Sequence, residues 1–136
     1  DQVIRRRREE YRKFAAWIVK RYARVILEDF DLRQVAQKPE PEQGTRGTLP
    51  PDRQRFIASV SELRQAIKNA ARREGVEIVT VPAEYTTITC YACGYIEKFD
   101  TAMHLWHTCS ACGALWDQDE NAARVLLQRA SELKSA

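Results

Sequence analysis

Four cysteines in two matched turns are the residues of this sequence best suited to chemistry. Cys90 and Cys93 belong to one CxxCG turn, Cys109 and Cys112 belong to a second, and fifteen residues separate Cys93 from Cys109. Each CxxC turn offers two thiolates, and the glycine that follows permits a tight reversal of the backbone. Four soft ligands from two turns suit a tetrahedral Zn²⁺ ion, so the spacing predicts a structural zinc ribbon.

The cysteines allow other interpretations as well. A pair of disulfides or a redox-active CxxC is less favoured, because the sequence has no secretory signal and the turn is duplicated. His104 and His107 are close enough in sequence to be alternative ligands, although four cysteines already complete a tetrahedron. Of the nearby aromatic residues, Trp106 is expected to lie in a small core beside the metal, and Tyr91 could serve either that core or base stacking.

Two carboxylates stand at the ends of expected secondary-structure elements. Glu28 follows the aliphatic run Val25-Ile26-Leu27, and Asp119 lies where a final helix is expected to begin. An acidic residue after a strand is usually just solvated, and an aspartate in a first helical turn is usually stabilised by the helix dipole and backbone N–H groups. The residue chemistry alone therefore favours ordinary structural roles for both carboxylates over a joint metal site.

The elements that would position these residues follow from the hydrophobic pattern. Apolar residues three or four apart predict helices, and short β-branched runs predict strands. The expected order is a helix over 4–24, a strand over 25–28, a Pro- and Gly-rich loop over 34–51, a helix over 52–74, a strand over 76–81 and, after the cysteine segment, a helix capped by Asp117. Helix, strand, helix, strand is typical of a parallel α/β unit.

Composition and charge restrict the class of protein. Hydrophobic residues make up 44% of the chain and charged residues 30%, no apolar run approaches the length of a membrane span, and a cytoplasmic protein is expected. The net charge is only +3, yet eighteen of the 22 Lys and Arg residues precede Gly75. This basic half is a candidate surface for a polyanion, with a solvated helix face as the equally weighted alternative.

The order of these pieces resembles a known family. A strand ending in Ile26-Leu27-Glu28-Asp29, a helix, a strand, two CxxCG turns and the run from Asp117 to Ala123 (DQDENAA) together resemble the C-terminal half of the RuvC-like nucleases. The chain is most similar to TnpB proteins and to the type V CRISPR effectors descended from them. The resemblance implies an α/β fold, a partial RNase H-like (RuvC) fold with an inserted four-cysteine zinc ribbon. It assigns 1–84 to the nuclease core, 85–116 to the ribbon and 117–136 to the final helix.

The resemblance also implies roles for the two carboxylates. In that family three carboxylates hold two Mg²⁺ ions, and Glu28 corresponds to the second and Asp119 to the third. Two Mg²⁺ ions about 4 Å apart require bridging oxygens, which carboxylates on rigid element ends can supply. The first aspartate would belong to an upstream strand that this sequence lacks. The chain is therefore expected to be part of a larger effector and to be inactive by itself.

Three classes of function remain at this stage. The leading hypothesis is a fragment of an RNA-guided DNA endonuclease, with guide RNA and target DNA as partners, structural Zn²⁺ and catalytic Mg²⁺. The alternative is a nucleic-acid-binding zinc-ribbon module with an inactive nuclease core, and an aspartate on the upstream first strand would separate the two. A zinc-ribbon module for protein interactions is the third class, which negligible affinity for nucleic acid at moderate salt would favour.

Overall fold

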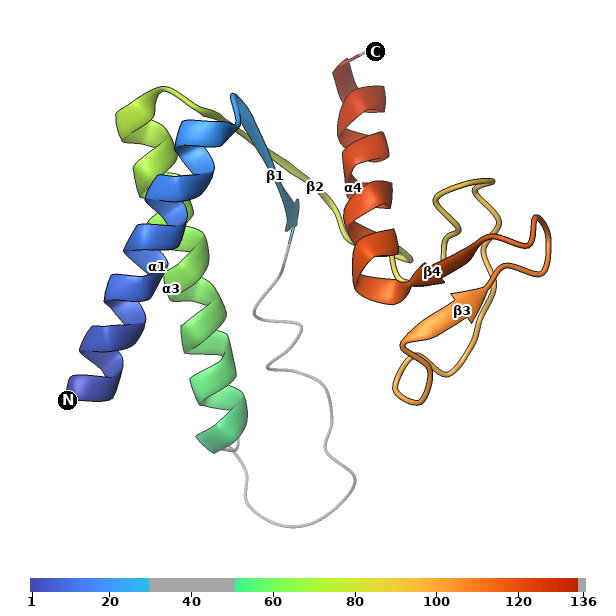
Figure 1. Ribbon diagram of the computed structural model, residues 1–136, viewed down its shortest axis with the longest axis horizontal. Helices are drawn as coiled ribbons and strands as arrows, with labels where there is room; N and C mark the ends of the chain where they lie inside the picture. Colours follow the sequence, from blue (N-terminus) through green and yellow to red (C-terminus); the bar gives the residue numbers. More distant parts are fainter. Residues whose placement is uncertain (30–50, 135–136) are drawn as a thin grey trace. The chain divides into compact units, whose positions relative to one another are not determined.

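The computed structural model describes residues 1–29 and 51–134 (Figure 1). By their contacts these residues form two units, 1–25 with 51–78 and 26–29 with 79–134. Within them, no helix combines the length and apolar character that crossing a membrane requires. The loop predicted over 34–51 lies outside the described residues, apart from its last residue.

Two helices, α1 (Gln2–Arg21) and α3 (Pro51–Glu74), lie side by side in the first unit (Figure 1). The Asp1 side chain caps α1 by accepting a 3.0 Å hydrogen bond from the Val3 N–H. Gly75 follows α3 with φ at +69°, a left-handed conformation that favours glycine and ends the helix. Both predicted helices are confirmed, although α1 ends at Arg21 and Arg24 already belongs to a strand.

Polar contacts fix how α1 and α3 pair. Glu62 on α3 accepts hydrogen bonds from the Arg7 guanidinium at 2.9 and 3.1 Å and from that of Arg8 at 3.3 and 3.4 Å. Burial raises the pKa of Glu62, but its hydrogen bonds and charge interactions with Arg7 and Arg8 lower the pKa overall. The contribution of these ion pairs is therefore present at neutral pH and lost as acid protonates Glu62.

Both helices bury small residues. Ala15 on α1 and Ala70 and Ala71 on α3 are all buried. We expect Ala15→Leu to lower the free energy of unfolding by about 1–3 kcal/mol, because extra methylenes in a packed interface force neighbouring side chains to move. Urea unfolding followed by helical circular dichroism measures the change. Lys13→Leu, at an exposed position of the same helix, is the control, and an equal loss in both variants would contradict the packing argument.

The strands β1 (Arg24–Asp29) and β2 (Glu77–Pro82) are neighbours in a two-stranded sheet. The β-branched and aliphatic residues of both segments suit a partly buried sheet, and Val25 and Val81 are buried. Both predicted strands are thus confirmed, and they pair with each other. Glu28 lies half-buried as the penultimate residue of β1, and Asp29 is exposed at its end.

The second unit contains a short hairpin followed by a helix. Strands β3 (Trp106–Thr108) and β4 (Leu115–Asp117) pair antiparallel, with His107 opposite Trp116. Helix α4 (Gln118–Lys134) follows β4 directly. The Asp117 carboxylate accepts hydrogen bonds from the N–H groups of Asp119 at 3.0 Å and Glu120 at 3.2 Å, so the predicted cap is confirmed. The described residues thus form a mixed α/β arrangement with a cysteine-rich hairpin.

Candidate metal centre

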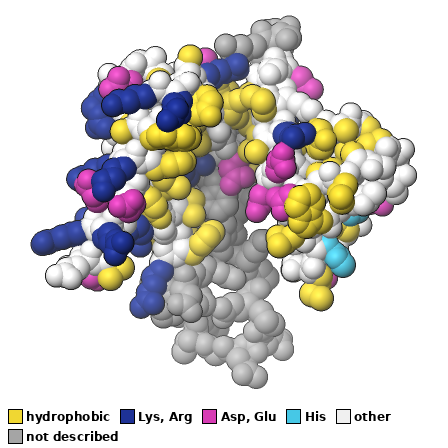
Figure 2. Space-filling view, viewed as in Figure 1, with side chains coloured by type: hydrophobic (Ala, Val, Ile, Leu, Met, Phe, Trp, Pro, Cys, Tyr) yellow, Lys and Arg dark blue, Asp and Glu magenta, His cyan; other side chains and the backbone are white. Residues whose placement is uncertain are grey.

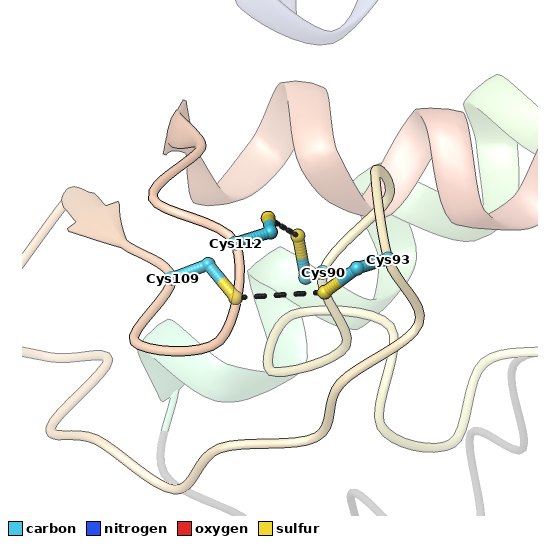
Figure 3. Close-up of side chains that lie close together, drawn as sticks. All are labelled: Cys90, Cys93, Cys109 and Cys112. Carbon is cyan, nitrogen blue, oxygen red and sulfur yellow. Dashed lines mark hydrogen bonds between the residues drawn. The ribbon is translucent and has the colours of Figure 1, made fainter.

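The four cysteine thiols converge on one point (Figure 3). All four Sγ atoms lie within 4.8 Å of one another. The Sγ atoms of Cys90 and Cys112 are 3.7 Å apart, as are those of Cys93 and Cys109, so both close pairs join the two turns. A tetrahedron with Zn–S bonds of about 2.3 Å requires sulfur separations of about 3.8 Å. The arrangement therefore fits a tetrahedral Zn²⁺ ion. All four thiols are free, and the disulfide interpretation finds no support.

The two turns that carry the cysteines are built alike. In the first, the Gly94 N–H donates a 2.8 Å hydrogen bond to the Cys90 carbonyl, and in the second the Gly113 N–H donates one of 2.8 Å to the Cys109 carbonyl. Gly94 and Gly113 have φ angles of +79° and +77°, which side chains other than glycine rarely adopt. The glycine in each CxxCG turn is therefore required by the backbone reversal, as the sequence predicts.

The thiols influence one another's protonation. Burial raises the pKa of Cys90, but hydrogen bonds from the backbone N–H groups of Cys93 and Ala92 and from neighbouring thiols lower it to about 7. For Cys93, a backbone hydrogen bond from Tyr95 lowers the pKa, but burial and the hydrogen bonds of its thiol to the other cysteines raise it to about 12. Without a cation one thiol ionises at the expense of its neighbours. A divalent cation can neutralise all four thiolates together.

A small aromatic core lies beside the thiols. Cys90, Cys109 and Trp116 are buried and are joined by the partly buried Tyr91, Phe99 and Ala114. The prediction that Trp106 belongs to this core is wrong, because its side chain is 60% exposed whereas that of Trp116 is 3% exposed. Trp106 pairs with Asp117, one position along from Trp116, and successive residues of a strand point to opposite faces. The register therefore turns Trp106 away from the core.

His107 supports this core and is not among the converging ligands. Its ring stacks on Phe99 with centroids 4.0 Å apart and lies 5.0 Å from the Trp116 ring. Its Nε2 atom is 2.9 Å from the Glu97 carboxylate, which also accepts a hydrogen bond from the Ser110 N–H at 3.2 Å. These hydrogen bonds from His107 and Ser110 lower the pKa of Glu97. Among the described residues, the cluster of possible metal ligands contains the four cysteines and neither histidine.

Polar side chains of α4 hold the segment that leads into the first cysteine turn. Asn121 is fully buried and hydrogen-bonds the backbone of Thr86, Thr89 and Tyr91. Gln128, on the same helix, donates a 2.7 Å hydrogen bond to the Tyr91 carbonyl. Sequence reasoning missed the role of Asn121. The sequence feature that could have indicated this role is the D-x-D-x-N run. Its asparagine is a polar residue in a helix whose other positions are partly apolar.

The two predicted catalytic carboxylates belong to the same unit but to different elements. Glu28 is on β1, and Asp119 is the second residue of α4 with an exposed side chain. Within the described residues, the groups of three or more possible metal ligands that converge consist of cysteines alone. The Mg²⁺ site thus has no support from this geometry, and the assignment of Glu28 and Asp119 stays a prediction.

Four converging cysteines in two turns, followed directly by a helix, define a zinc-ribbon type of metal site. Residues 61–126 match the family model described as "Cas12f1-like, TNB domain". The chain also shares the fold of part of the Cas12f1 chain in a cryo-EM structure of the Cas12f1-sgRNA-target DNA complex, with a TM-score of 0.64 and 18% identity over 92% of this chain and 34% of that one.

Two curated relatives are named CRISPR-associated DNA-binding protein Cas12m. The one from Thermanaerosceptrum fracticalcis is 58% identical over 93% of this chain and 21% of its own length. The one from Allomeiothermus silvanus is 44% identical over 99% of this chain and 25% of its own length. The chain belongs to the C-terminal, TnpB-related zinc-ribbon region of type V CRISPR effectors of the Cas12m and Cas12f kind. It spans between a fifth and a quarter of the length of these two relatives.

Proposed function

We propose that this chain is the zinc-ribbon region of an RNA-guided effector that binds DNA, with a guide RNA and the target DNA as partners. The convergence of four thiols within the residues that match the family model carries the proposal. The relatives named DNA-binding proteins support the binding function. In such effectors base pairing with the guide reads the sequence, and the protein contributes a positive surface and the correct shape.

Zinc has a structural role in this proposal. Cys90, Cys93, Cys109 and Cys112 would hold the ion as thiolates, and the bound ion would supply folding free energy to the ribbon, residues 85–116. Residues 1–84 and 117–136 would form part of a RuvC-like core around it. The ribbon would then hold a fixed position at the start of α4, because β4 leads into that helix without a break.

The first unit offers a surface for phosphate groups. Helix α1 contains eight Lys and Arg residues against two Glu residues. Figure 2 shows Lys and Arg side chains gathered over this unit. Phosphate contacts of this kind give affinity without sequence preference and release counterions, which makes binding depend strongly on salt. Such contacts would complement the guide, which provides the sequence specificity.

This surface predicts a salt-dependent binding defect. Replacing Arg5 and Arg6, both exposed, with glutamine should weaken DNA binding by the chain and lower the slope of log K against log salt by about one per lost phosphate contact. Fluorescence anisotropy over a salt series measures both. Arg124→Gln is the matched control, because that guanidinium is already paired with Glu120 at 2.7 Å and lies 4.4 Å from the Tyr91 ring centroid. Negligible binding by the unsubstituted chain at moderate salt would instead favour a protein-interaction module.

DNA cleavage by a RuvC-like site is a second candidate function. The exposure of Asp119 in the first turn of α4 favours it, because the side chain there is accessible to an ion and to substrate. Glu28 would provide the other carboxylate from β1, and Mg²⁺ would activate water and stabilise the leaving oxygen. Cleavage would also need an aspartate from an upstream strand. An effector with these carboxylates but without that aspartate would bind its target without cutting it.

A further inference from the structure

The buried polar side chains of the described residues gather at one joint. They are Thr86, Gln118 and Asn121, and all three lie where the ribbon meets the first turn of α4. Elsewhere in the described part of the chain the buried side chains are apolar or cysteine. Burying a polar group is unfavourable unless it is hydrogen-bonded, so this joint is held by specific hydrogen bonds and not by apolar contact alone. We call these three residues the polar joint.

Asn121 uses its side-chain amide fully. Its Nδ2 atom donates hydrogen bonds to the carbonyl of Thr86 at 3.0 Å and to that of Thr89 at 2.7 Å. Its Oδ1 atom accepts a 2.9 Å hydrogen bond from the N–H of Tyr91. The asparagine amide thus bonds to the backbone on both sides of Cys90, whose thiol is one of the four ligands. A displacement of the first cysteine turn away from α4 would therefore lengthen or break these bonds.

Gln118, the first residue of α4 and three residues before Asn121, bonds the other part of the ribbon. Its side-chain amide donates hydrogen bonds to the carbonyls of Thr101 at 2.7 Å and His104 at 3.1 Å. Its backbone N–H donates a hydrogen bond to the Leu105 carbonyl at 2.9 Å. The loop between the two cysteine turns is therefore tied to the same helical turn. Asp119 lies in that turn, between the two anchoring residues.

We propose that the polar joint couples metal occupancy of the four cysteines to the order of the first turn of α4, with Asn121 as the positioning residue. Metal loss frees the backbone that Asn121 bonds, which leaves a buried amide without partners until the turn opens to water. The exposed Asp119 side chain then loses its fixed orientation. The inference rests on zinc binding as proposed above, and it adds that the ribbon controls the carboxylate-bearing turn.

Hydrogen exchange of the whole chain tests this coupling in four states, with and without zinc, for the unsubstituted protein and for Asn121→Ala. Zinc should raise the protection of amides 119–122 by roughly tenfold or more in the unsubstituted chain, since a broken buried hydrogen bond is worth about 1–3 kcal/mol. In Asn121→Ala, saturating zinc should protect the cysteine turns but change amides 119–122 much less. A merely structural asparagine would lower protection equally in both metal states.

Zinc affinity, measured by competition with a chromogenic chelator, gives an independent readout. Asn121→Ala should bind zinc roughly tenfold to a hundredfold more weakly, as expected for a group that positions ligands without being one. Asn69→Ala is the matched control, because Asn69 is an exposed asparagine of α3 that bonds only Gln65 in the described structure. Protection of α1 and α3 reports whether each variant has folded.

The outcomes separate this inference from the proposed function. An unsubstituted chain that binds no zinc contradicts the proposed function and the inference with it. A chain that binds zinc without any change in the protection of amides 119–122 overturns the inference alone, and this measurement needs no variant. Equal zinc affinity in Asn121→Ala and Asn69→Ala overturns it as well.

Discussion

Removal of zinc should unfold residues 85–116 while α1 and α3 stay helical. The core beside the thiols contains one buried aromatic side chain, Trp116, and a segment of this size with so small a core does not fold unaided. Structural zinc sites of this type supply about 10–16 kcal/mol of binding free energy at neutral pH, which is folding free energy for the segment. Helices α1 and α3 contact each other in the other unit, so their helical structure should not depend on the ion.

Elemental analysis and hydrogen exchange before and after chelation provide the measurement. Protein purified without chelator should contain one zinc ion per chain. Chelation should remove protection from the two cysteine turns and, through the coupling proposed above, lower that of amides 119–122, while α1 and α3 keep their protection. Cys109→Ser should give the same result without chelator, since three thiolates leave the ion open to water. Ser110→Ala, at the exposed neighbouring position, should retain the zinc. Zinc-free protein with a protected ribbon would contradict the structural role of the ion.

The parts of the fold that sequence predicts well are those set by local spacing. The two CxxCG turns depend on the left-handed backbone of Gly94 and Gly113, and a pattern of five residues is enough to encode such a turn. Helices α1 and α3 extend over many turns, so their apolar periodicity is visible in the sequence. Both kinds of prediction are confirmed for this reason.

Trp106 shows where local spacing fails. Strands β3 and β4 have three residues each, too few for alternation to indicate which face meets the core. The burial of Trp116 and the exposure of Trp106 follow from the pairing register, which depends on residues on both strands. Composition makes either tryptophan suitable for the core, and only the register decides between them.

Asn121 shows a second limit. Its hydrogen bonds reach thirty or more residues back along the chain, and no helical period reveals a long-range contact to backbone atoms. Glu28 and Asp119 pose the same difficulty, since a shared metal site depends on how β1 and α4 are brought together and on a third carboxylate from elsewhere. For these residues the sequence provides candidates through resemblance, and the chemistry has to be tested directly.

Replacing Glu28 with Gln or Asp119 with Asn in the full-length effector should reduce DNA cleavage by more than about a hundredfold while leaving target binding nearly unchanged. Under the proposed cleavage function, each change would remove one charge that a pair of Mg²⁺ ions would need for bridging, and losing such a clamp would remove several kcal/mol of transition-state stabilisation. Binding should persist because it depends on guide pairing and phosphate contacts. Cleavage and binding of a labelled target, measured in parallel, separate the two effects.

Asp119→Asn is the more informative of the two substitutions. The side chain is exposed and the cap of α4 is provided by Asp117, so the change should leave folding within about 0.5 kcal/mol of the original. Glu132→Gln, an exposed carboxylate near the other end of α4, is the control and should cut normally. Full cleavage by both the Glu28 and Asp119 variants would contradict the catalytic assignment. If the unsubstituted effector binds its target without cutting it, the DNA-binding function stands and the proposed cleavage function is wrong.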